Sequence, residues 1–301
     1  MKSVDAIYKQ LLFSPMTDGL TTEETLEKEV VFTQQRYFIH LAYDGGGFCG
    51  WQIQNNGDTV QAALNFALSK ILNEHVATMG CGRTDTGVHA TSFYAHFTTG
   101  KELPSRFADR LNSILPKTIS IFNVIPVHPK AHTRFDAYSR TYEYYINFYK
   151  SPFLRSYSMH CFVNDLNWDA IHQASAMLTT FKDFTSLCRP SDDFKTNICD
   201  VTEARWDAVK KMPIAGPGED EFMRFTITSN RFLRGMVRKT VGTLLMVGSG
   251  KISVEQFHDT VTNQKEFYKT TLAPPNGLYL TDVKYPYPLD GNVHWVRPQQ
   301  Q

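Results

Sequence analysis

The ten residues Cys81-Gly82-Arg83-Thr84-Asp85-Thr86-Gly87-Val88-His89-Ala90 join two β-prone stretches of the chain. The first stretch is the short apolar run at 76–79, and the second is the alternating run TSFYAHFT at 91–98. Glycine permits tight turns and close backbone approach, so the glycines on either side predict a short loop that displays the Asp85 carboxylate. Arg83, two residues away, favours the charged form of that carboxylate.

The spacing of this loop leaves its purpose open. Threonine and aspartate between glycines are common in surface turns, where they hydrogen-bond to nearby backbone. Asp85-Thr86-Gly87 is also the tripeptide of aspartic proteases, but those enzymes bring two copies together, and here one copy follows polar residues. A hydrolase built on Asp85 would need a second carboxylate within reach, and no paired acid accompanies the motif.

The composition is that of an ordinary globular protein, and 301 residues suffice for two domains. The formal net charge is only +1, so an RNA partner would require basic residues that are clustered rather than abundant. The five cysteines form no C-x-x-C pair, which argues against a disulfide framework and against a zinc site. No apolar run is long enough for a signal peptide or a membrane span, which predicts a cytoplasmic protein with reduced thiols.

The first half of the chain predicts the order strand, helix, strand, strand, helix, strand. Alternating residues indicate strands at 36–43 and 119–127, and helical spacing indicates helices at 58–72 and 105–115, the first with Asp58 as its N-cap. The glycine-rich residues 44–50 read as a mobile loop. This order is typical of helices that cover one face of a largely antiparallel sheet.

The second half predicts a similar order. A tyrosine-rich run at 137–148 predicts a long strand that places Arg140, Tyr142 and Tyr144 on one face. Further elements are expected as helices at 168–178 and 232–247, strands at 201–209 and 222–229 joined near 216–218, and a strand at 279–283 that closes the sheet. Residues 1–35 form an N-terminal extension with a short helix expected at 22–29.

Gly82-Arg83-Thr84-Asp85-x-Gly87-Val88-His89-Ala90 resembles the catalytic loop of the tRNA pseudouridine synthase A family. Companion motifs follow in the family's order: Tyr43-Asp44-Gly45, Gly50-Trp51-Gln52-x-Gln54, Thr59-Val60-Gln61, Leu111-Asn112-x-x-Leu115-Pro116, His132-x-Arg134-Phe135-x-Ala137, Arg140-x-Tyr142-x-Tyr144, Asp183-Phe184-Thr185-Ser186, Phe232-Leu233-Arg234-x-Met236-Val237-Arg238 and Gly277-Leu278-Tyr279-Leu280. The chain departs from the family pattern at Ile53, Thr86 and Asn276, and none of these changes removes a catalytic group.

The resemblance implies an α+β fold of two similar sheet-plus-helix domains, 36–130 and 131–301, that form a central cleft. It also implies an isomerase that converts uridine to pseudouridine at positions 38, 39 and 40, in the anticodon stem-loop of tRNA. We therefore expect a homodimer that binds tRNA and uses neither a cofactor nor a metal ion. The alternative is a tRNA-binding or RNA-chaperone protein of the same fold without turnover.

The resemblance also assigns roles to single residues. Asp85 matches the nucleophile, Arg238 the arginine that pairs with it, Tyr142 the tyrosine that stacks on the target base and takes part in deprotonation at C5, and Leu278 the apolar residue against which the uracil rests. An arginine in the apolar helix predicted at 232–247 would be costly to bury alone, which independently favours a carboxylate partner for Arg238. Candidate phosphate contacts are Arg36, Arg83, Arg106, Arg110, Arg134, Arg140, Arg231, Arg234 and Lys239.

Overall fold

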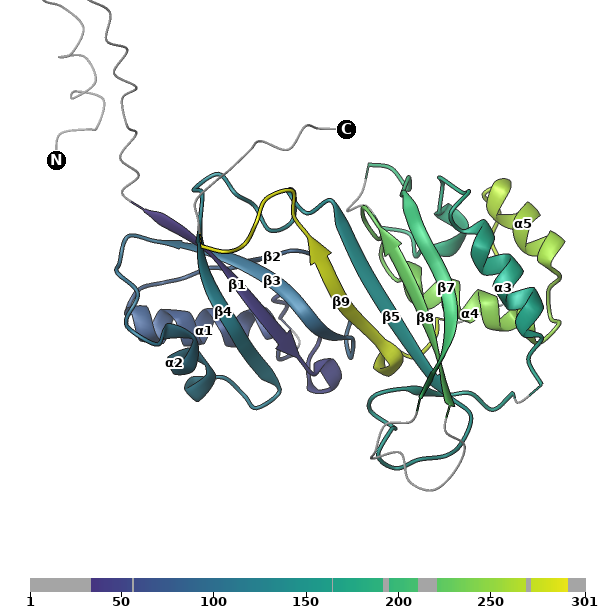
Figure 1. The fold of residues 1–301 in the computed structure, drawn as a ribbon, viewed down its shortest axis with the longest axis horizontal. Helices are drawn as coiled ribbons and strands as arrows, with labels where there is room; N and C mark the ends of the chain where they lie inside the picture. The colour runs from purple at the N-terminus through teal and green to yellow at the C-terminus, as the bar shows by residue number, and fades with distance from the viewer. Residues whose placement is uncertain are drawn as a thin grey trace, which may run out of the picture. The chain divides into compact units, whose positions relative to one another are not determined.

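A computed structural model of the protein describes residues 34–55, 57–163, 165–191, 195–210, 221–268 and 272–291 (Figure 1). The helix predicted at 22–29 and the turn predicted at 216–218 lie outside these residues, as does the predicted extension apart from its last two positions. None of the helices in the described ranges combines the length and the apolar character that crossing a lipid bilayer requires.

The described strands form one mixed sheet in the order β4-β1-β3-β9-β5-β8-β7. The sheet is antiparallel except where β3 pairs with β9 and β5 pairs with the short β6. The strands are β1 (Gln35–Tyr43), β2 (Met79–Gly80), β3 (His89–Thr99), β4 (Ile119–Val127), β5 (Ser139–Asn147), β6 (Met159–His160), β7 (Val201–Lys210), β8 (Glu221–Ser229) and β9 (Leu278–Lys284). The chain is therefore α+β, as predicted.

The two halves of the sheet repeat one arrangement. The first half runs β4-β1-β3 with β2 beside β3, and the second runs β9-β5-β8-β7. They meet where β3 and β9 pair through His89 with Tyr279 and Ala90 with Leu280. The last strand was expected to close the sheet, but β9 lies at its centre. β9 is central because it pairs with β3 along one edge and with β5 along the other, while Leu278 and Leu280 are buried in the core.

The described helices are α1 (Val60–Leu72), α2 (Phe107–Ile114), α3 (Trp168–Met177), α4 (Met236–Gly248) and α5 (Val254–Thr262). Thr59, and not Asp58, caps α1, because its hydroxyl accepts the N–H of Ala62 (3.3 Å). α4 begins four residues later than predicted, since Gly235 adopts the left-handed conformation with φ +65°. α5 was not predicted, although Ser253 and Gln256 carry the capping-box signal.

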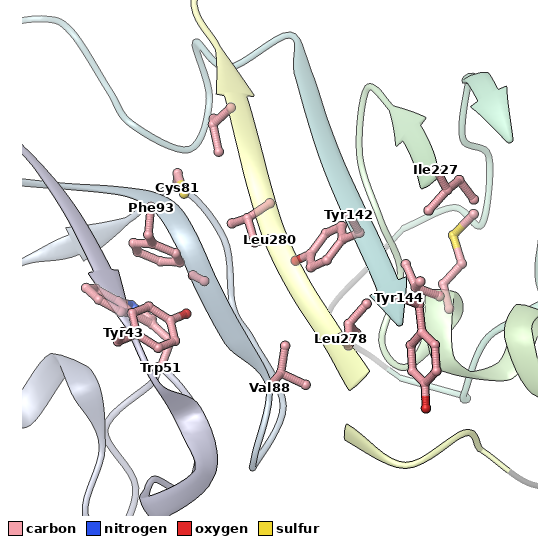
Figure 2. Close-up of a cluster of buried hydrophobic side chains, with 14 of the residues drawn as sticks. Tyr43, Trp51, Cys81, Val88, Phe93, Tyr142, Tyr144, Ile227, Leu278 and Leu280 are labelled. Carbon is pink, nitrogen blue, oxygen red and sulfur yellow. The ribbon is translucent and has the colours of Figure 1, made fainter. Parts of the chain in front are cut away.

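The helices of both halves pack into one contiguous apolar core against the sheet. Leu64 and Leu68 of α1 belong to this core, as do Val241 and Leu244 of α4. Figure 2 shows part of it, with Tyr43, Trp51 and Phe93 grouped on one side and Tyr142 and Leu278 on β5 and β9 on the other. The core therefore includes side chains from both β3 and β9, the strands that pair where the two halves meet.

Candidate active site

The Asp85 loop, residues 81–88, links β2 to β3 and is held by backbone contacts on both sides of the carboxylate. The N–H of Trp51 donates to the carbonyl of Thr84 (3.3 Å), and the N–H of Gly87 donates to the carbonyl of Phe48 (3.2 Å). The buried hydroxyls of Tyr43 and Thr84 lie 2.9 Å apart. β1 and the segment that follows it thus hold the residues on both sides of Asp85 in place.

Two glycines of the 44–50 segment allow its backbone to pack directly against the Asp85 loop. A Cβ at Gly45 would lie 1.9 Å from the carbonyl oxygen of Val88, and one at Gly50 would lie 2.3 Å from that of Thr84. Gly50 also has φ +84°, which disfavours any other residue there. The sequence suggested a mobile loop at 44–50. The structure forms a 3-10 turn at Gly45–Gly47 and packs Gly45 and Gly50 on the Asp85 loop.

The structure brings Asp85 and Arg238 together. Nη1 of Arg238 donates to Oδ2 of Asp85 (3.1 Å), and Nε donates to the carbonyl of Ala273 (2.7 Å). The Asp85 side chain is 33% exposed and that of Arg238 is 14% exposed. The carboxylate is therefore charge-paired on one oxygen while part of it faces solvent, where a substrate can reach it.

Tyr142 and Leu278 lie in the same cavity as Asp85 and are both largely buried. The Tyr142 ring meets the Phe232 ring edge-on, with centroids 4.9 Å apart and planes at 82°. Burial raises the pKa of Tyr142 above its usual value, with further contributions from neighbouring groups, so its phenol stays neutral at neutral pH. Figure 2 shows Tyr142 projecting from β5 beside Leu278 and Leu280 of β9.

Arg140 also lines the cavity, but the hydrogen bonds of its guanidinium go to protein backbone. Nη1 donates to the carbonyls of Ala137 (2.7 Å) and Asn230 (2.8 Å). Nη2 donates to those of Cys81 (3.0 Å) and Arg134 (2.6 Å). One side chain thus joins the Asp85 loop to the β4–β5 connection and to the segment after β8. Its contact with RNA stays a prediction.

The cavity has a volume of about 670 Å³ and a strongly positive lining. Among the described residues that line it are six arginines and a single carboxylate, that of Asp85. The arginines are Arg83, Arg134, Arg140, Arg231, Arg234 and Arg238. A chain with a formal net charge of only +1 therefore concentrates positive charge around one acid.

The remaining basic candidates lie away from this lining. Arg36 donates to the carbonyl of Ala131, Arg106 pairs with Asp109, and Lys239 donates to the carbonyl of Cys188. Arg110 donates to the carbonyl of Ser105 on the surface of α2. Within the described parts of the chain, no group of three or more His, Cys, Asp or Glu side chains is placed to hold a metal ion.

The sequence did not identify Phe232 as the ring partner of Tyr142, or Gly50 as the residue that packs on the Asp85 loop. Phe232 was read as part of a helix, and only its place before the left-handed Gly235 could have signalled a loop. The contact of Gly50 joins segments more than thirty residues apart, which local spacing does not reveal.

Comparison with known proteins points to a single family. The family model described as tRNA pseudouridine synthase matches residues 39–136 and 174–286. The chain is similar to "tRNA pseudouridine synthase A" of Bacteroides thetaiotaomicron, with 46% identity over 84% of this chain and 91% of the relative. Proteins of the same name from Bacteroides fragilis and Neisseria meningitidis are 45% and 37% identical over 84% of this chain, and 97% and 93% of the respective relatives.

Proposed function

The chain belongs to the tRNA pseudouridine synthase family, and from that premise we propose how and where it isomerises uridine to pseudouridine. We propose that it acts on positions 38, 39 and 40, in the anticodon stem-loop of tRNA, with Asp85 as the nucleophile. The observation that carries this proposal is the partly exposed Asp85 carboxylate, the one acid among the described residues that line a cavity with six arginines. The arginines suit a polyanionic substrate.

The reaction breaks the bond between N1 of uracil and C1′ of ribose and forms a bond between C5 and C1′. The C5 proton is lost and N1 gains one, so atoms and electrons balance without a redox partner. A carboxylate nucleophile forms a transient covalent bond. Attack at C1′ would replace the N1–C1′ bond with a bond from Asp85 to the sugar, which C5 of the turned uracil then displaces. Attack at C6 would bond Asp85 to the uracil ring, and this bond would break again once the C5–C1′ bond has formed. Attack at C1′ and attack at C6 both fit this geometry, since either atom can approach the exposed part of Asp85.

In our proposal, Tyr142 binds the target base and Arg238 positions the nucleophile. The Tyr142 ring stacks on the target uracil, and Leu278 supports the base. Because the phenol of Tyr142 is neutral, it can accept the C5 proton only by giving its own proton to another base. Arg238 pairs with the Asp85 carboxylate and holds it in position.

We also propose a two-domain architecture. Two domains, 36–130 and 131–301, would each contribute one half of the repeated sheet and form the cleft that holds the target base. We further propose that the protein is cytoplasmic and acts as a homodimer, so that a second copy adds basic surface to the grip on one tRNA. Sedimentation of the protein with and without tRNA tests the dimer.

Mapping of the modified sites tests the proposed substrate. Three transcripts of one tRNA are prepared, each with uridine at one of positions 38, 39 and 40 and another base at the other two. Each transcript is incubated with the protein and read for pseudouridine by chemical labelling and primer extension. We expect a stop at the uridine in each transcript. Modification at a uridine outside the anticodon stem-loop, with none at these three, would contradict the assignment.

A further inference from the structure

Phe135 is an unusual residue for the rim of a charged cavity. It lines the cavity that holds Asp85, and it is 75% exposed. A single exposed apolar side chain needs no explanation by itself, because such residues are common on protein surfaces. What distinguishes Phe135 is how firmly its backbone is held in this exposed position.

The turn that carries Phe135 is fixed by His132 and Asp136. Nδ1 of His132 lies within hydrogen-bond distance of the N–H groups of Arg134 (3.1 Å) and Phe135 (3.2 Å). Oδ2 of Asp136 accepts the N–H of His132 (2.7 Å) and the hydroxyl of Tyr287 (2.6 Å). Asp136 is itself buried. The exposed phenyl ring therefore projects from a rigid turn and not from a mobile loop.

The surroundings of the ring suit a nucleobase. The His132 ring supports the Phe135 ring at a centroid distance of 4.3 Å, with planes at 33°. The Arg134 guanidinium lies over the ring, 5.7 Å from its centroid. An aromatic ring beside cationic side chains is the combination that binds unpaired nucleotides, because the base stacks while the cations meet the phosphates.

We propose that Phe135 is a stacking platform for a nucleobase that neighbours the target uridine in the bound tRNA. This inference rests on the proposed function, because a uridine that leaves its stack to reach Asp85 exposes the faces of its neighbours. The Phe135 ring covers one of those faces and stabilises the opened stem-loop. Phe135 thus binds substrate and takes no part in bond breaking.

The size of the effect follows from stacking energies. Aromatic stacking on a base is worth about 1 to 3 kcal/mol, which corresponds to a roughly 5- to 150-fold change in affinity. Stacking releases no counterions, so the dependence of affinity on salt is unaffected by the ring. Loss of a phosphate contact, in contrast, lowers the slope of log affinity against log salt by about one.

Four variants test the proposal on a tRNA transcript with [5-³H]uridine, with tritium release and fluorescence-anisotropy binding measured for each. Phe135→Ala and Phe135→Leu remove the ring, and Phe135→Tyr keeps it. Phe162→Ala is the matched control, because Phe162 is 85% exposed and does not line the cavity. The leucine variant keeps an apolar side chain on the turn, should alanine destabilise it.

We expect KM and Kd to rise about 5- to 150-fold in both ring-less variants, with kcat within twofold of wild type and the salt slope unchanged. Phe135→Tyr and Phe162→Ala should match wild type. Ring-less variants with unchanged Kd, or a tyrosine variant as weak as alanine, would overturn the inference. If wild type releases no tritium, the proposed function fails, and the Kd series still decides whether Phe135 stacks.

Discussion

Arg238 and Asp85 lie 153 residues apart in the chain, and their side chains meet with Nη1 of the arginine 3.1 Å from Oδ2 of the aspartate. The arginine comes from the first turn of α4, in the second half of the repeated sheet, and the aspartate from the loop before β3, in the first. The pair therefore couples the placement of the Asp85 carboxylate to the packing of the other half of the chain.

Removal of the Arg238 guanidinium should impair turnover more than binding. We expect Arg238→Ala to lower kcat about 100-fold, because the carboxylate loses the charge that orients it in a partly buried site. Arg238→Lys keeps the charge but lacks the fork that also reaches the carbonyl of Ala273, and it should recover only part of the loss. Steady-state tritium release measures both variants. A kcat of Arg238→Ala within twofold of wild type would refute the coupling.

Arg140 should be needed for stability as well as activity. Its guanidinium donates to four carbonyls in three segments of the chain, and the ammonium of Arg140→Lys cannot replace this pattern. Since hydrogen bonds from charged groups contribute about 1.5 to 3 kcal/mol each, we expect a loss of at least about 2 kcal/mol in the free energy of unfolding. Urea unfolding checks this, with Arg110→Lys as the control on an exposed helix. Equal stability of the two variants would argue against the structural role.

Gly50 should tolerate no side chain. In Gly50→Ala the new Cβ would meet the carbonyl oxygen of Thr84 at 2.3 Å, and the backbone would be strained at φ +84°. We expect a loss of about 2 kcal/mol or more in unfolding free energy, with lower kcat, because the Asp85 loop must shift. Gly47→Ala is the matched control, since a Cβ there meets nothing within 4 Å. The account is wrong here if both variants behave alike.

Stability should fall on the acid side of neutrality through His96. Burial, with smaller contributions from His132 and Arg36, lowers the pKa of His96 to about 3. The unfolded value is about 6.5, so the folded state binds fewer protons, and stability present above pH 6.5 is lost as pH falls toward 3. His96→Gln removes the imidazole and with it this pH dependence of stability. Between pH 7 and 5 wild type should lose about 1 to 2 kcal/mol more than the variant, as measured by urea unfolding. Parallel losses would exclude His96 as the cause.

The sequence predicted what depends on local pattern. The order of strands and helices in the first half, and the common face of Arg140, Tyr142 and Tyr144, follow from residue periodicity. The structure confirms the order and places Tyr142 and Tyr144 together in the core. The family was recognised from short motifs and is confirmed by the family model. The domain boundaries stay predictions.

What depends on contacts between distant segments was not predicted. The central place of β9, the four carbonyls bound by Arg140 and the closeness of Gly50 to Thr84 arise only once segments that are distant in the chain pack together. No periodicity within one segment encodes these contacts. The pairing of Asp85 with Arg238 was expected only because burial of a lone guanidinium is costly and because the family pattern supplied its partner.

The central claim is that Asp85 is the nucleophile, and tritium release from tRNA labelled at C5 of uridine tests it most directly. Wild type, Asp85→Asn and the control Asp109→Asn, which alters a carboxylate on the exposed surface of α2, are compared at saturating tRNA, with Kd measured for each. We predict release by wild type and Asp109→Asn, no detectable release by Asp85→Asn, and similar Kd for all three. Release by Asp85→Asn at the wild-type rate would contradict the mechanism, and binding without release by any of them would leave an RNA-binding protein.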